Sequence, residues 1–484
     1  MPRFLSRLLG SNAASLPVTV ALLSLPLVVV TGGALDLVAY ERMRARLQDS
    51  VDRGVLAAAS LRQAQGAQET VRSFVDSASG FADYAVSVTE ERSTNERRVS
   101  AHAEGEVQTN FLRLIGIDTM AVTVDASAEE SRKNIEVSLI LDVSGSMRWD
   151  SANRFPGLTV MTKRIDFLRP AAKDFLDIVL SDDARDYTTV SLVPYAGQVN
   201  VGADLFELLG GTKLHSKSSC FEFAPNELTI GMPSFRGRAQ TPHFTHFNHH
   251  DAIKSLNERK LTQPWWCPDD PHGTILSGLI DFVPGEGDDR DVTSVSLMSN
   301  DREALKHRID NYKLYDGTGT PVALKWGLLF LDPAFQPTVD RAFASPSRAA
   351  SLGLRPEFRT RPARFDDEGS EKFIVLMTDG AVSQQFRPKD RGRKIHYSDA
   401  RSDGTNDEVT DAAVMERGVA TLCTQAKANG VIVFTIGFDV NDSVARQMTD
   451  CATGPGHFYR VTSSNVAQAF TSIATQIQKI RLVR

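Results

Sequence analysis

From Asn134 onward, short apolar runs alternate with longer amphipathic ones, and this alternation constrains the fold more than any other feature. The runs typical of buried strands are Ile135–Leu141, Thr188–Val193, KFIVLM, GVIVFTIGF and HFYRV. Helical periodicity marks RIDFLRPAAKDFLDIVL, VTDAAVMERGVATLCTQAKAN, DSVARQMTDCA and NVAQAFTSIATQIQKIRLV. Continuous apolar strands joined by helices predict a mostly parallel sheet with both faces covered, which is an α/β domain.

Two stretches interrupt this alternation. Residues 198–291 are rich in Gly, Pro, His and aromatic side chains, and residues 333–369 are polar and rich in Pro and Arg. Both are too long to be ordinary connections. We therefore expect them to be insertions into a domain of residues 134–484, presented at a sheet edge or on the ligand-binding face.

The N-terminal region contains an apolar run, Leu16–Leu35, of 20 residues without a charge, which is long enough to cross a bilayer as a helix. After a short segment, 1–15, we expect a retained transmembrane helix at 16–39. A cleaved signal peptide is one alternative, but its apolar core is usually shorter, about 7–15 residues, and it needs no amphipathic continuation. A buried helix of a soluble protein is the other alternative.

Residues 40–133 are predicted to form a helical extension followed by a small β segment. The stretches YAVSVTEE, RRVSAHAEGEV and TMAVTVDASA have alternating patterns, and NFLRLIGI has the pattern of an apolar helical turn. We expect a long helix that leads into a small antiparallel sheet. A spacer that merely holds the main domain away from a membrane is the alternative.

Composition and motifs exclude several classes of function. The net charge is only −6 over 484 residues, and no basic run with interleaved aromatic residues occurs, which argues against nucleic-acid binding. The chain has no G-x-x-x-x-G-K-[ST], H-E-x-x-H or G-x-S-x-G motif. We therefore expect a protein that is not an enzyme, with a metal-dependent hydrolase as the alternative.

The four cysteines, Cys220, Cys267, Cys423 and Cys451, are even in number and contain no C-x-x-C motif. We expect two disulfides, Cys220 with Cys267 and Cys423 with Cys451, the second between neighbouring helices. Buried free thiols are the alternative for a cytosolic protein. Disulfides favour an oxidising compartment, so the C-terminal bulk of the chain is expected to lie outside the cytoplasm.

The stretch LILDVSGSM contains the candidate site. An apolar strand ends at Asp142, Ser144 and Ser146 follow at steps of two, and Gly145 permits a tight loop. Ligands of open α/β sheets bind at the carboxyl ends of the strands, and Mg²⁺ prefers about six oxygen ligands. A cation site is therefore indicated, and an Asx-turn with a helix cap and no metal is the alternative.

D-x-S-x-S after a buried strand resembles the metal-ion-dependent adhesion site of von Willebrand factor A domains, which have a Rossmann-like fold. That family adds a threonine from a second loop and an aspartate from a third. In this chain DGTGTPVALKWG offers Thr318, with Thr320 as the nearby alternative, and FIVLMTDG offers Asp379.

The resemblance implies a division of roles among these residues. Ser144, Ser146 and Thr318 would bind Mg²⁺ (or Mn²⁺ or Ca²⁺) directly. Asp142 and Asp379 would act largely through water or backbone amides. Because few carboxylates touch the cation, it would attract a carboxylate from a protein partner.

The N-terminal segment resembles the TadE/TadG-like proteins of tight-adherence (Flp) pilus assembly. The matching positions are Gly33, Asp36, Leu47, Gln48, Asp52, Leu56 and Ala57. LKWGLLFLDP and IQKIRLVR also resemble the TadG branch, which fuses this anchor to a von Willebrand A domain. The resemblance implies an adhesion or assembly protein with other pilus-assembly components as partners. It also implies a single-pass protein of the bacterial inner membrane, with the bulk of the chain periplasmic or extracytoplasmic. A structural spacer whose metal site has lapsed is the alternative.

Three further residues or clusters allow two interpretations each. Ser15 stands where the pseudopilin branch has a glutamate, five residues after Gly10, so we expect no processing by a prepilin peptidase. Asp36 is expected at the level of the lipid headgroups, or less often at a partner contact within the membrane. His243, His246, His249, His250 and Asp251 are expected in a solvated loop, with a zinc site as the alternative.

Overall fold

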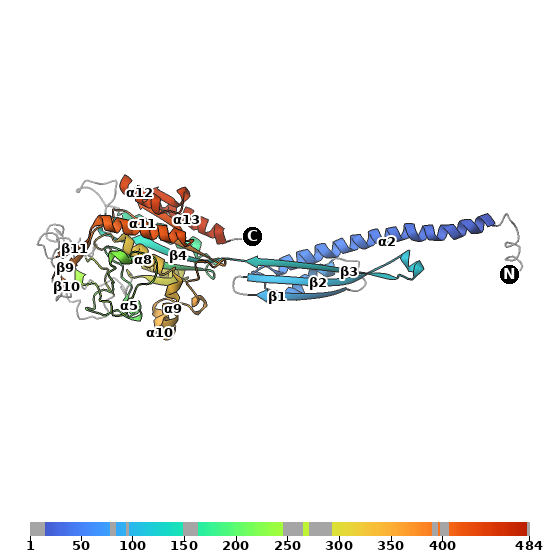
Figure 1. Cartoon of the computed structure of the whole chain (residues 1–484), viewed down its shortest axis with the longest axis horizontal. Helices are drawn as coiled ribbons and strands as arrows, with labels where there is room; N and C mark the ends of the chain where they lie inside the picture. The colour runs from blue at the N-terminus through green and yellow to red at the C-terminus, as the bar shows by residue number, and fades with distance from the viewer. Residues whose placement is uncertain are drawn as a thin grey trace. The chain divides into compact units, whose positions relative to one another are not determined.

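The computed structural model describes residues 15–77, 84–92, 96–148, 163–244, 265–270, 293–389, 395–396 and 406–481. The chain divides into two compact units, the first ending at Arg132 and the second running from Lys133 to Leu482. Both are shown in Figure 1.

In its described residues, the first unit contains two helices and a three-stranded antiparallel sheet. Helix α2 (Ser15–Ala58) and helix α3 (Ala67–Ser77) precede the strands β1 (Tyr84–Arg92), β2 (Glu96–Gln108) and β3 (Thr119–Ser131), and a 3₁₀ turn, η1 (Leu112–Ile115), joins β2 to β3. Every second residue of β2 from Arg97 to Val107 is buried. This face packs on α2 and α3 through Leu47, Val51 and Val71, so the sequence alternation correctly predicted a small α+β segment.

Helix α2 continues through the expected end of a membrane span at residue 39. Among the described residues, no helix is both long and apolar enough to cross a membrane. The expected transmembrane helix at 16–39 is therefore not confirmed.

Asp36 has a structural role that neither sequence interpretation included. Its side chain is 4% exposed and accepts hydrogen bonds from the backbone N–H groups of Asn110 (3.0 Å), Phe111 (2.8 Å) and Leu112 (2.8 Å). The carboxylate therefore fastens the turn between β2 and β3 to helix α2, because three amides that begin a 3₁₀ turn would otherwise lack acceptors.

The second unit is built on a six-stranded sheet in the order β13-β12-β8-β4-β5-β7. The strands are β4 (Asn134–Asp142), β5 (Thr188–Tyr195), β7 (Ser296–Ser299), β8 (Ser370–Thr378), β12 (Ile432–Phe438) and β13 (Phe458–Val461). All neighbours are parallel except β5 and β7, which are antiparallel. The predicted α/β fold is confirmed, and β7, which the sequence did not reveal, makes the sheet mixed.

Helices cover both faces of this sheet. One face carries α4 (Arg164–Val179), α7 (Arg302–Asp310) and α13 (Val466–Arg481). The other carries α5 (Ala203–Leu208), α8 (Thr320–Leu329), α9 (Gln336–Ala342), α10 (Pro346–Ser351), α11 (Ala412–Ala428) and α12 (Asp442–Cys451). Strand β4 contributes to both cores, because Ile135, Val137 and Leu139 face α4 whereas Ile140 faces α8.

Shorter elements complete the second unit. Two small ladders pair β6 (His243–Phe244) with β10 (Ile395–His396), and β9 (Gln385–Pro388) with β11 (Asn406–Thr410). The 3₁₀ turns are η2 (Gly145–Arg148), η3 (Pro225–Glu227), η5 (Pro333–Phe335), η6 (Pro356–Phe358) and η7 (Pro455–His457).

The insertion at 333–369 packs against the sheet domain. Phe335 and Val339 lie in the core on the α8 side. The Arg361 guanidinium donates to the carbonyls of Ile135 (3.1 Å) and Tyr187 (2.8 Å), at the amino ends of β4 and β5. Through Arg361 this insertion therefore contacts the end of the sheet opposite to Asp142, and not the ligand-binding face, which was one of its two expected positions beside a sheet edge.

Candidate metal centre

Asp142 is the last residue of the central strand β4, and both its carboxylate oxygens accept hydrogen bonds. Oδ1 accepts from the Ser144 backbone N–H (2.8 Å), which is the Asx-turn that the metal-free interpretation required. Oδ2 accepts from the Thr378 hydroxyl (2.9 Å) and from the hydroxyl of Tyr195 (3.3 Å), which lies opposite Asp142 on β5. Asp142 is completely buried, so its position at the strand end is fixed from three sides.

A row of oxygen atoms continues from this loop to a second one. The Ser144 and Ser146 hydroxyl oxygens are 2.8 Å apart, and the Ser146 hydroxyl donates to Asp379 Oδ1 (2.6 Å). Asp379 directly follows strand β8, 233 positions along the chain from Ser146. An Asx-turn is local, so it does not account for this long-range contact.

The loop with the candidate threonines lies beside the first loop. The Tyr315 backbone N–H donates to the carbonyl of Val143 (2.9 Å), and Tyr315 forms a parallel bridge with Ser144. Thr318 and Ser383 exchange two hydrogen bonds: the Thr318 N–H donates to the Ser383 hydroxyl, and the Ser383 N–H donates to the Thr318 carbonyl. The Thr318 loop is therefore tied to the loop that follows Asp379.

Thr318 and Thr320 differ in their contacts. Thr320 begins helix α8, and its hydroxyl oxygen is 3.4 Å from that of Tyr195, which also contacts Asp142. In the part of the chain that the structure describes, no hydrogen bond joins the Thr318 hydroxyl to the other four predicted side chains. The structure thus links Asp142, Ser144, Ser146 and Asp379 in one network and places the Thr318 backbone next to it.

The electrostatics of this network favour positive charge. Burial raises the pKa of Asp142, and burial together with the nearby Asp142 charge raises the pKa of Asp379 to about 7. Burial and Asp142 also raise the pKa of Tyr195. Arg164 Nη1 donates to Asp379 Oδ2 (2.9 Å), while Arg164 Nε lies 3.5 Å from Asp439 Oδ2. Two buried carboxylates so close together are stabilised by any cation beside them.

The oxygen spacing fits a small divalent cation. In an octahedral site with metal–oxygen distances of about 2.1 Å, neighbouring ligand oxygens lie about 3 Å apart. The consecutive separations of 2.8 Å and 2.6 Å along Ser144 Oγ, Ser146 Oγ and Asp379 Oδ1 are close to that value. All these donors are hard oxygens, as Mg²⁺ and Mn²⁺ prefer.

Three residues of the network were not predicted from the sequence. Thr378 directly precedes Asp379 in the same motif, and Tyr195 ends the strand next to Asp142, so adjacency in sequence or register could have indicated both. Arg164 reaches Asp379 across 215 positions, and no local pattern indicates that contact.

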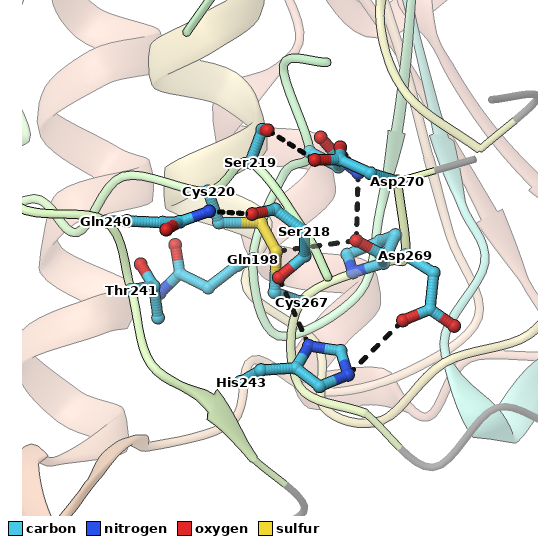
Figure 2. The surroundings of a disulfide bond; sticks show 12 residues. Gln198, Ser218, Ser219, Cys220, Gln240, Thr241, His243, Cys267, Asp269 and Asp270 are labelled. Atoms are coloured by element: carbon cyan, nitrogen blue, oxygen red, sulfur yellow. Dashed lines mark hydrogen bonds and ion pairs between the residues drawn. A yellow bond between two sulfur atoms is a disulfide. The ribbon is translucent and has the colours of Figure 1, made fainter. Parts of the chain in front are cut away.

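Both predicted disulfides are present. Cys423 and Cys451 join α11 to α12 with their Cα atoms 5.0 Å apart, and Cys220 and Cys267 join two parts of the insertion at 198–291 with theirs 6.2 Å apart. Figure 2 shows the Cys220–Cys267 bond within a polar network, in which the Ser219 hydroxyl donates to Asp270. The Asn200 amide also donates to Asp270.

The segment held by Cys267 contacts the loop that leads to Thr318. The Asp316 N–H donates to the Trp265 carbonyl (2.9 Å), and the Gly197 N–H donates to the Asp316 carbonyl (2.7 Å). Gly317 has φ +77°, and a Cβ there would lie 2.4 Å from the Trp266 ring. The insertion therefore fixes the loop immediately before Thr318, and only glycine satisfies both the backbone angle and the close contact.

The histidine cluster gains no support as a zinc site. The expected solvated loop is wrong for His243, which lies on β6 and is 1% exposed. Its Nδ1 is 3.2 Å from the Ser218 hydroxyl and its Nε2 is 3.3 Å from Asp269 Oδ1 (Figure 2). Burial raises the pKa of Asp269 to about 7. His246, His249, His250 and Asp251 lie outside the described residues. Within the described ranges, no three His, Cys, Asp or Glu side chains are grouped so that they could hold a metal ion.

Residues 14–63 match a family model, the putative Flp pilus-assembly TadE/G-like family. The N-terminal segment is TadE/G-like, as its sequence indicated. The match covers the whole of helix α2 and ends before α3. No curated protein matches the chain in sequence.

Several solved structures are similar to the chain at low identity. The pilus adhesin SpaC from Lactobacillus rhamnosus GG is 13% identical, with a TM-score of 0.33 over 82% of this chain and 35% of SpaC. The chain thus spans about a third of the length of SpaC. The vWF domain of the type V pili tip protein Mfa5 from Porphyromonas gingivalis is 14% identical, with a TM-score of 0.33 over 73% of this chain and 97% of that domain. The PilB minor pilin from Streptococcus sanguinis is 13% identical, with a TM-score of 0.32 over 82% of this chain and 79% of PilB.

Proposed function

We propose that this chain is a non-enzymatic interaction protein of the bacterial envelope that acts in Flp-type pilus assembly or surface adherence. The observation that carries the proposal is the contact between Ser146 and Asp379, which brings oxygens of two distant loops together at the carboxyl ends of the strands. The TadE/G-like match of residues 14–63 supports the envelope and pilus part of the proposal.

In this proposal the centre holds Mg²⁺, or Mn²⁺ or Ca²⁺ in its place, through the hydroxyl oxygens of Ser144, Ser146 and Thr318. Asp142 and Asp379 act largely through water or backbone amides. The use of both Asp142 oxygens by protein donors supports such an indirect role. The bound cation would supply an open coordination position for a carboxylate of a partner protein. Because the direct ligands are neutral hydroxyls, the chain leaves much of the cation's charge available to that carboxylate.

We place the chain at the bacterial inner membrane, attached through the N-terminal helix, with the second unit outside the cytoplasm. Two disulfides in one unit support an oxidising compartment. The charge-free stretch Leu16–Leu35 supports membrane attachment. In this arrangement the candidate metal centre is accessible to other pilus-assembly components in the envelope.

The test is capture of envelope proteins by the immobilised full chain, with Mg²⁺ or with a chelator, followed by mass spectrometry. We expect a set of captured proteins that is lost with chelator and lost in Ser146→Ala. Ser351→Ala, on the exposed face of α10, is the matched serine control and should capture the same set as the native chain.

If the same proteins are captured with and without chelator, and by the native chain and Ser146→Ala, the proposal is contradicted and a structural spacer is favoured. Metal-dependent hydrolysis of a model ester or peptide by the same preparation, lost in Ser146→Ala, would replace it with a hydrolase.

A further inference from the structure

The exposed apolar side chains of the described residues are concentrated in one part of the first unit. All the large ones except Val409 and Leu56, which is near the C-terminal end of α2, lie either between Val20 and Val38 on α2 or in the turn between β2 and β3. Those in this part of α2 are Val20, Leu23, Leu27, Val28, Val30, Leu35, Leu37 and Val38, and those in the turn are Leu114, Ile115 and Ile117. In the turn, Leu114 is 64% exposed and Ile115 56%. Such a concentration on a folded protein marks a contact surface.

The turn and the helix form one surface because they are firmly attached to each other. Asp36 accepts three backbone hydrogen bonds from residues 110–112. A Cβ at Gly32 would lie 2.2 Å from the Phe111 ring, and one at Gly33 would lie 3.0 Å from Leu112. The glycine pair therefore lets the turn lie directly on the helix. This attachment sets Leu114 and Ile115 beside the C-terminal end of the charge-free stretch.

The chemistry of the surrounding residues points to lipid as the occupant. From Pro26 to Thr31 every side chain of α2 is exposed or partly exposed, and none of them is charged. Charged side chains begin at Asp36, which the turn covers, and continue with Glu41, Arg42 and Arg44. The turn itself contains one charge, Arg113, between Thr109 and Ile117. Apolar side chains bordered by arginines suit the boundary between acyl chains and anionic headgroups.

We infer that the turn at residues 111–117 inserts into the same lipid leaflet as the N-terminal helix, as a second membrane contact of the chain. This inference rests on the membrane attachment proposed above. Insertion of the turn would fix the depth of the helix and its rotation about its axis, because Asp36 and the two glycines hold the two elements together.

The inference can be tested with single cysteines that carry an environment-sensitive fluorophore. All four native cysteines are paired, so an introduced thiol is labelled selectively. The full chain would be labelled at Ile115→Cys in the turn, at Val28→Cys on the helix, or at Arg92→Cys in the same unit. It would then be placed in vesicles of phosphatidylethanolamine and phosphatidylglycerol that contain a nitroxide-labelled lipid as quencher.

We expect blue-shifted emission and comparable lipid quenching at positions 28 and 115, and water-like emission at position 92. Quenching at position 28 with water-like emission at position 115 would overturn the inference and leave the membrane attachment intact. Water-like emission at both positions would overturn both. Shielding of position 115 that appears only at raised protein concentration would assign the turn to a second copy of the chain and overturn the inference.

A second measurement does not depend on labels. Replacing Leu114, Ile115 and Ile117 by Ser together should lower partitioning of the full chain into the same vesicles by roughly tenfold or more, because three apolar side chains lose their lipid contact. The control replaces two exposed apolar residues that are not part of this surface, Leu56 near the C-terminal end of α2 and Val409, by Ser. Equal partitioning of both variants would overturn the inference.

Discussion

Substitution of Gly327 tests how the two elements that lead into the candidate metal centre are held. Strand β4 ends at Asp142, helix α8 begins at Thr320, and the two are in contact at Gly327. A Cβ at Gly327 would lie 2.5 Å from Ile140 Cδ1, and the Ser138 hydroxyl donates to the Gly327 carbonyl (2.7 Å). An added methyl group must therefore either displace the Ile140 side chain or separate the helix from the strand.

The expected size follows from two opposing contributions. Overpacking a buried contact costs about 1–3 kcal/mol, whereas replacing a helical glycine by alanine contributes about 1 kcal/mol in the other direction. Gly327→Ala alone should therefore lower the free energy of unfolding by about 0–2 kcal/mol. Ile140→Val removes the obstructing Cδ1 atom and should cost about 1 kcal/mol alone.

The decisive quantity is the coupling between the two substitutions. Because Ile140→Val makes room for the alanine, the double variant should be more stable than the sum of the single effects by about 1–2 kcal/mol. Urea denaturation followed by tryptophan fluorescence reports on the second unit alone, since all four tryptophans lie within it. Strictly additive effects would show that Gly327 and Ile140 do not limit the approach of α8 to β4.

Three further substitutions test other parts of the second unit. Replacing Cys423 and Cys451 by Ser opens a link across a sequence separation of 28 and should lower the free energy of unfolding by about 3–4 kcal/mol, whereas a reductant should affect only the native chain. Lys325 is 2% exposed, and burial lowers its pKa to about 8 from the ordinary 10.5. Between about pH 8 and about pH 10.5, the unfolded state therefore binds a proton at Lys325 that the folded state does not bind. The stability of the native chain relative to Lys325→Met should therefore rise from about pH 8 to about pH 10.5, measured by urea denaturation, and a constant difference would refute the assignment. Arg164→Gln removes the guanidinium bonded to Asp379, so the melting temperature without Mg²⁺ should fall. On addition of Mg²⁺, the melting temperature of this variant should rise more than that of the native chain. An equal rise in both would contradict a role of Arg164 in neutralising Asp379.

The strands that carry the candidate metal centre were predictable because their signal is local. LILD and LMTD each end a continuous apolar run with an acid, and this pattern indicates both the strand and the edge at which it ends. The structure extends β4 to Asp142 and ends β8 at Thr378, within a residue or two of the predicted bounds. Strand β7 escaped prediction because its four residues, SLMS, are too few to show a period.

Contacts between residues far apart in sequence could not be predicted. Asp36 follows an apolar run, so the sequence favoured a position at the headgroups, and its three donors lie more than 70 positions away. The insertion at 333–369 was predicted at a sheet edge or on the ligand-binding face because of its length and its Pro-rich, Arg-rich composition. Its contacts with the amino ends of β4 and β5 through Arg361 join residues more than 170 positions apart, and no local pattern indicates them.

Direct measurement of Mn²⁺ binding tests whether oxygens from separate loops hold one divalent cation. Free Mn²⁺ is quantified by electron paramagnetic resonance during titration of the full chain, with Mg²⁺ as competitor. We predict a single Mn²⁺ bound per chain, displaced by Mg²⁺ and lost in Ser146→Ala. Binding should be retained in Ser138→Ala, which removes a buried hydroxyl of strand β4 that is bonded to Gly327 and not to the site. Equal binding by the two variants, or no binding by the native chain, would contradict the account.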